Sequence, residues 1–86
     1  MPEISRFFGI IIRMYYNDHA PPHVHAEYQG EKVLLDFSGN ILRGGLGSRT
    51  ALRLVREWID LHETELKEDW GLARAGTGLL PIEPLK

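Results

Sequence analysis

The spacing of apolar residues changes along the chain from a strand pattern to a helix pattern. Residues 4–16, ISRFFGIIIRMYY, are apolar on both alternating sets and rich in β-branched and aromatic side chains, which is typical of a central strand. Gly9 within this run indicates a bulge. Residues 23–28 instead alternate, which predicts a strand with one buried face. Its apolar set is Val24, Ala26 and Tyr28.

Short polar segments separate these runs from further strands. QGEK turns the chain into VLLDF, and SGN turns it again towards Ile41 and Leu42. Turn segments of this length between apolar runs are typical of hairpins. The first half of the sequence therefore predicts an antiparallel meander of three to four strands.

The second half has the spacing of an amphipathic helix. Ser48 is a suitable N-cap, and apolar residues follow at i, i+3 and i+4 spacing. Gly71 is expected to interrupt the helix and Gly76 to end a short second piece. The tail GLLPIEPLK contains two prolines, so it is excluded from the centre of a sheet but is able to dock at an edge. We predict an α+β fold, with one long helix and a short second helix on one face of the sheet.

Length and composition limit the number of domains, the cellular compartment and the classes of partner that are expected. The 86 residues predict a single domain over positions 1–86. Apolar runs are too short to cross a bilayer, no secretory signal is recognisable, and the absence of cysteine fits a reducing cytoplasm. The net charge of −2 argues against a general nucleic-acid coat, although the basic excess lies in residues 1–56.

Three of the four histidines lie within DHAPPHVH, around a double proline. His23 and His25 share one face of the predicted strand, and Glu27 continues that face. Two imidazoles and a carboxylate suit a divalent transition metal such as zinc, iron or nickel, and His19 or Asp18 could complete the set from the turn. The structural alternative is a stiff turn whose imidazoles bond backbone carbonyls. Because the opposite face of the strand is apolar, the cluster is expected at the surface.

Acid–base chemistry without a metal is a further hypothesis for the same stretch. Imidazoles can act as base and acid in phosphodiester cleavage when a cation neutralises the phosphate. Arg13 on the preceding run could supply that charge, and Tyr15 shares its face. The candidate catalytic residues are Arg13, Asp18, His19, His23 and His25.

A second candidate site is the segment LRGGLGSRTALR, where a glycine-containing loop opens the helix. Free N–H groups at a helix start can hold an anion, and Arg49, Arg53 and Arg56 follow on one helix face. The alternative is an ordinary solvated face with i, i+4 ion pairs. The glycines match neither the P-loop nor the dinucleotide pattern.

Taken together, ISRFFGIIIRMYYNDHAPPHVHAEY, ALRLVREWIDLHETEL and the later DW and LA pairs resemble domain-of-unknown-function family 4160. The specific part is DHxPPHxH, and the resemblance covers nearly the whole chain. It implies a small prokaryotic protein whose distinctive site is formed by this motif. It also implies a partner, because members are often encoded beside a family 2442 protein in a toxin–antitoxin-like pair. The residues of the implied site are Asp18, His19, Pro21, Pro22, His23 and His25.

Two classes of function follow. The first is a toxin-like effector that acts on RNA or translation through the histidine cluster, paired with a family 2442-like antitoxin. The second is a non-catalytic interaction module, for which a sheet edge, Trp58 and Trp70 offer contact surface. A metal-binding domain that uses the His-x-His-x-Glu face is the other alternative.

Overall fold

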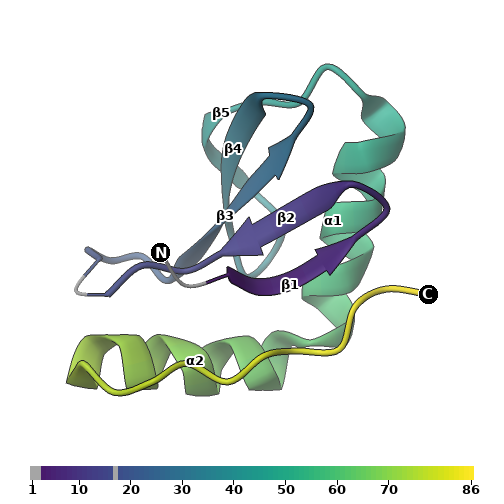
Figure 1. The fold of residues 1–86 in the computed structure, drawn as a ribbon. Coiled ribbons are helices and arrows are strands. Elements are labelled where there is room, and N and C mark those ends of the chain that lie inside the picture. The colour runs from purple at the N-terminus through teal and green to yellow at the C-terminus, as the bar shows by residue number, and fades with distance from the viewer. Residues whose placement is uncertain (1–2, 17) are drawn as a thin grey trace.

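Five antiparallel strands form one sheet and are followed by two helices in the computed structural model (Figure 1). The structure describes residues 3–16 and 18–86. The strands are β1 (Glu3–Phe7), β2 (Ile10–Arg13), β3 (His23–Tyr28), β4 (Glu31–Asp36) and β5 (Ile41–Gly44), and the helices are α1 (Arg49–Leu61) and α2 (Glu63–Ala75). Each strand pairs with the next along the chain, so the sheet is a meander. The predicted α+β class is confirmed, but the sheet has five strands, one more than the highest number predicted.

The extra strand comes from the apolar run of residues 4–16, which is not a single strand. It folds back on itself at Phe8 and Gly9, whose φ angles are 50° and 80°. Positive φ at both central residues is the requirement of a type I′ hairpin turn, and glycine adopts it without a steric penalty. Gly9 is therefore a turn residue, and the predicted bulge at this position is wrong. The prediction of a central strand holds for β2, which lies between β1 and β3.

The other predicted turns are present. Gln29 and Gly30 join β3 to β4 with φ angles of 49° and 82°. The chain then turns again between β4 and β5, where the Asp36 carboxylate accepts the N–H groups of Ser38 and Asn40 at 2.9 Å. The register of β4 against β3 is continuous, whereas the pairing of β4 with β5 shifts between Leu34 and Leu35.

The helical half breaks at a different place from the one expected. His62 separates α1 from α2 with φ −119° and ψ 25°, and both helices contain thirteen residues. Gly71 lies inside α2, so the predicted interruption there is wrong, and so is the prediction of one long helix followed by a short one. Ser48 caps α1 as predicted, because its hydroxyl accepts the N–H of Ala51 at 3.0 Å, and Gly76 ends α2 in the left-handed conformation.

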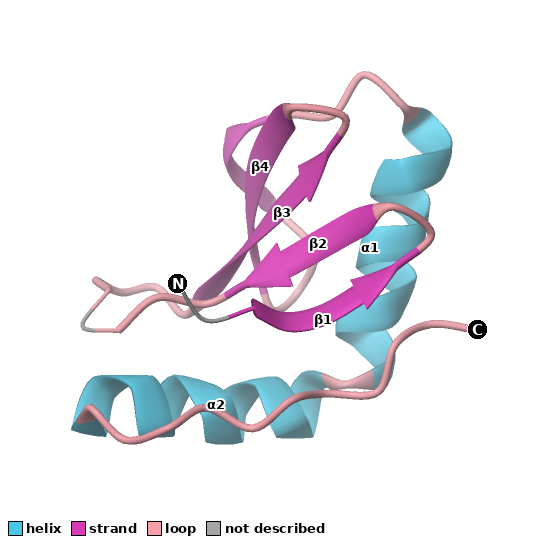
Figure 2. Cartoon of the chain, viewed as in Figure 1, coloured by secondary structure: helices cyan, strands magenta, loops and turns pink. Residues whose placement is uncertain are grey.

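The core lies between one face of the sheet and α1. The helix buries Ala51, Val55, Trp58 and Ile59. The sheet supplies the alternate residues of β2, β3 and β4, which are Ile10, Ile12, Val24, Ala26, Val33 and Leu35. Helix α2 turns away from α1 and runs past the end of the sheet at which β3 begins (Figure 2). Within residues 3–16 and 18–86, neither helix has the length and apolar character needed to span a membrane.

The tail after α2 returns along this helix to the first strand (Figure 1). The N–H of Leu80 donates to Asp69 Oδ1 at 2.9 Å, and the N–H of Ile82 donates to the carbonyl of Ile4 at 2.8 Å. Trp58 Nε1 donates to the carbonyl of Glu83, also at 2.8 Å. The tail therefore docks at the β1 edge, as the two prolines allowed.

Candidate functional site

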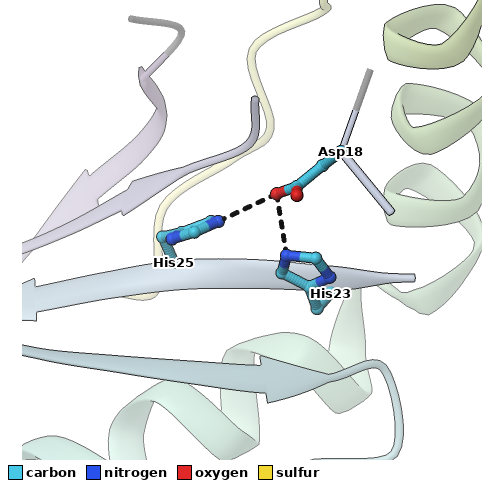
Figure 3. A group of neighbouring side chains, drawn as sticks. All are labelled: Asp18, His23 and His25. Atoms are coloured by element: carbon cyan, nitrogen blue, oxygen red, sulfur yellow. Dashed lines mark hydrogen bonds and ion pairs between the residues drawn. The ribbon is translucent and has the colours of Figure 1, made fainter. Parts of the chain in front are cut away.

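The loop between β2 and β3 brings Asp18 over the start of β3 (Figure 3). Oδ2 of Asp18 lies 2.8 Å from Nε2 of His23 and 3.1 Å from Nε2 of His25. These three ligand atoms all lie within 4.8 Å of one another. A turn residue and two alternate residues of one strand thus direct their polar atoms at a common point.

The hydrogen bonds of His23 fix which of its nitrogens carries a proton. Nδ1 donates to the carbonyl of Pro21 at 2.8 Å. A neutral imidazole has one N–H, and this bond uses it. Nε2 then presents a lone pair to Asp18 Oδ2, which is itself an acceptor. The contact at 2.8 Å therefore needs either a proton between the two groups or a metal ion that both of them bind.

Burial differs strongly among the three histidines. The His23 side chain is 2% exposed, His25 is 27% exposed and His19 is 87% exposed. The expectation of a surface cluster is therefore wrong for His23. Trp70 of α2 is the reason, since its ring lies 5.4 Å from the His23 ring and covers that end of the strand. A buried imidazole cannot exchange protons with a substrate directly, which weakens the hypothesis of paired acid–base histidines.

The surroundings shift two pKa values in the cluster. Burial would raise the pKa of Asp18, but the hydrogen bond with His25 and the nearby His23 outweigh it, so this pKa lies below its ordinary value. Burial is the main reason that the pKa of His25 also lies below its ordinary value, against the opposing hydrogen bond with Asp18. Both shifts favour an ionised carboxylate beside a neutral imidazole, the forms that bind metals.

The structure pairs Glu27 with Arg13 and keeps both apart from the shared point. Arg13 lies opposite His25 in the β2–β3 ladder, and its Nη1 is 2.6 Å from Glu27 Oε1. Asp18 occupies the position at the two imidazoles that was assigned to Glu27. Tyr15 lies on the same side, with its ring 4.4 Å from that of His25. The charge of Arg13 is therefore already balanced within the protein.

In the arginine segment, two polar groups have partners within the protein. Glu31 Oε1 accepts the N–H of Gly47 at 2.7 Å, so an internal carboxylate occupies the loop before α1. Arg56 donates through Nε to the carbonyl of Gly39 at 2.9 Å, instead of pairing with the next turn of the helix. Arg49 and Arg53 are exposed on α1.

Two residues of α2 complete the surroundings of the cluster, and sequence reasoning did not assign either to it. Trp70 packs on His23, and Arg74 lines an open pocket of about 480 Å³ together with Asp18, His19 and Ala20. Trp70 was predicted as contact surface of an interaction module and not as a neighbour of the histidines. Nothing in the sequence pattern indicates that the end of α2 meets the loop before β3.

One comparison with known proteins gives a match. The family model described as Domain of unknown function (DUF4160) matches residues 9–71, which is more than half of the chain. The chain therefore belongs to this family, as the DHxPPHxH motif indicated. No curated protein and no solved structure matches.

Proposed function

We propose that Asp18, His23 and His25 bind a divalent transition metal ion. The observation that carries this proposal is the position of His23 Nε2, which faces a carboxylate oxygen although Nδ1 already donates to Pro21. A proton would satisfy one nitrogen of one ring. A metal ion would accept a lone pair from both rings and from the carboxylate at the same time.

The backbone contact of His23 supports this choice. A histidine that binds a metal through one nitrogen commonly donates its other N–H to a carbonyl or carboxylate, which fixes the tautomer and the direction of the ring. Pro21 supplies such a carbonyl at 2.8 Å. The double proline then has a role in ligand geometry, because it limits the motion of the carbonyl that orients the ring.

The two oxygen–nitrogen separations are close to those around a common ion. Bonds of about 2.1 Å at tetrahedral or octahedral angles place ligand atoms about 3.0 to 3.4 Å apart. Asp18 Oδ2 lies 3.1 Å from His25 Nε2, inside this range, and 2.8 Å from His23 Nε2, slightly below it. Nitrogen and carboxylate ligands suit zinc, iron or nickel, and three protein ligands leave coordination positions for water or substrate.

Calorimetric titration with zinc and with nickel tests the proposal. We expect Asp18→Asn and His25→Ala to weaken binding by more than the roughly 10- to 100-fold that outer-shell changes cause. The matched controls are Glu27→Gln, which removes the neighbouring carboxylate, and His19→Ala, which removes an exposed imidazole. Both controls should retain the affinity of the unmodified protein. Stoichiometric binding that survives in both Asp18→Asn and His25→Ala would overturn the metal site.

The biological role that we propose for this site is the one implied by the family resemblance. A toxin-like effector acting on RNA or translation could use a bound metal to polarise a phosphoryl oxygen or to activate water. Expression should then slow growth, and Asp18→Asn should relieve the effect while Glu27→Gln does not. An interaction module gives the opposite result, with inhibition that is independent of Asp18. A family 2442-like protein partner remains a prediction of the same resemblance.

A further inference from the structure

Arg74 extends the proposed metal site beyond its three ligands. It follows Trp70 by four residues on α2, so the two side chains lie on the same side of the helix. Trp70 holds that side against His23, and Arg74 then reaches the pocket lined by Asp18, His19 and Ala20. The volume of about 480 Å³ is enough for a small anion and its water.

A purely structural explanation of Arg74 is its position in the last turn of α2, where a cation interacts favourably with the helix dipole. That explanation accounts for the charge but not for its surroundings. In the part of the chain that the structure describes, no carboxylate oxygen lies within 4.0 Å of the Arg74 guanidinium. Asp18 lines the same pocket, yet its Oδ2 is directed at the two imidazoles. An exposed cation therefore borders a pocket beside the metal ligands.

We propose that Arg74 and the metal ion together bind a phosphoryl oxyanion, an inference that rests on the proposed metal site. A divalent ion held by one carboxylate and two neutral imidazoles carries a net charge of about +1, to which Arg74 adds a second positive charge. Arg13 cannot serve here because Glu27 already pairs with it. Arg74 lies beyond the residues that match the family model, so the inference concerns this chain.

The geometry of the anion favours phosphate over carboxylate. A guanidinium fork binds both oxygens of a carboxylate, which leaves none of them for the metal. A phosphate monoester has three non-bridging oxygens, so one can bind the metal while two meet the fork. A phosphodiester has two, as a carboxylate does, so it could place only one oxygen on each positive centre. The ligand class that fills the fork and the metal together is therefore a phosphate monoester or free phosphate, and dimethyl phosphate and acetate test the anions with two oxygens.

The test uses full-length protein loaded with Co²⁺, whose visible absorption reports on its ligands. Inorganic phosphate, dimethyl phosphate and acetate are titrated separately. We expect phosphate to change the spectrum, and Arg74→Gln to weaken its binding by about 10- to 100-fold while Co²⁺ affinity stays within about twofold. Arg53→Gln is the matched control, because it removes an exposed arginine elsewhere. Binding of dimethyl phosphate would assign the site to diesters such as an RNA backbone, and binding of phosphate alone to monoesters.

The two proposals fail in different ways. If Co²⁺ binds but Arg74→Gln binds phosphate as tightly as the unmodified protein, the role of Arg74 is overturned and the metal site stands. Acetate binding of equal strength and equal dependence on Arg74 would overturn the phosphoryl class. If Co²⁺ does not bind, the metal site and the joint site with Arg74 are both overturned. Phosphate titration of the metal-free protein by NMR then shows whether Arg74 binds the anion by itself: shifts at the Arg74 Nε–H and at His19 would leave Arg74 that role, and their absence would remove it.

Discussion

The start of β3 and the loop before α1 were both candidate sites, and the fold treats their polar groups differently. In the loop before α1, Glu31 accepts the N–H of Gly47, and within α1 Arg56 donates to the carbonyl of Gly39. These two donors have internal acceptors, so neither contact requires an external ligand. At the start of β3, two lone-pair-bearing groups face each other at His23 and Asp18, and a proton or a metal ion is required between them. A functional site is thus indicated by an imbalance of donors and acceptors, more than by the presence of charged residues.

Gly44 at the end of β5 and Gly45 in the loop that follows give the test with the largest expected effect on stability. Gly44 has φ +74°, and a Cβ there would lie 2.4 Å from the carbonyl oxygen of Lys32. We expect Gly44→Ala to lower the free energy of unfolding by more than about 3 kcal/mol, because the backbone of β4 would have to move. Gly45→Ala is the control, with open space around its Cβ and an expected change below about 0.5 kcal/mol. Urea unfolding measures both. Equal stability of the two variants would contradict the expected clash between a Cβ at position 44 and the backbone of β4.

The histidines at the start of β3 give the second largest expected effect on stability. We expect His23→Ala to cost about 2 to 3 kcal/mol of unfolding free energy, since it removes a buried ring and leaves the Pro21 carbonyl without its donor. His19→Ala should change stability by less than about 0.5 kcal/mol, because its ring is 87% exposed. Similar small losses in both variants would contradict the burial of His23. This expectation replaces the small cost that exposure of the cluster implied.

The smallest effect concerns Asp69, a buried carboxylate without the imidazole neighbours of Asp18. Burial raises the pKa of Asp69, so the folded protein takes up its proton at a higher pH than the unfolded chain does. The stability of the unmodified protein should therefore rise, relative to Asp69→Asn, as pH falls through this raised pKa towards the ordinary value. The asparagine oxygen can still accept the N–H of Leu80.

Urea unfolding of the unmodified protein and Asp69→Asn over a pH series measures this linkage. We expect the variant to be the more stable of the two at neutral pH, by less than about 1 kcal/mol, with the difference shrinking on acidification. Other groups titrate alike in both proteins and cancel in the difference. An advantage of the variant that grows in acid would show that Asp69 is stabilised in its charged form.

Local patterns were enough to predict the architecture in outline. Alternation in β3, the turn at Gln29 and Gly30, the Ser48 cap and the Gly76 stop are short-range effects of side-chain size and backbone freedom, so they are visible in the sequence. The prediction of one strand over residues 4–16 was wrong because two buried strands joined by a two-residue turn have the same composition as one longer strand. The helix break at His62 likewise has no glycine or proline to mark it.

The sequence by itself determined the residue types of the candidate site: the DHAPPHVH stretch contains the carboxylate, both imidazoles and the proline carbonyl within eight positions. Only the tertiary structure decided their roles. Asp18 rather than Glu27 meets the imidazoles because the loop folds back over β3, while Arg13 on the paired strand holds Glu27. Trp70 buries His23 and Arg74 borders the pocket because α2 packs across the sheet end. Spacing along one strand cannot encode contacts that depend on how a distant helix packs.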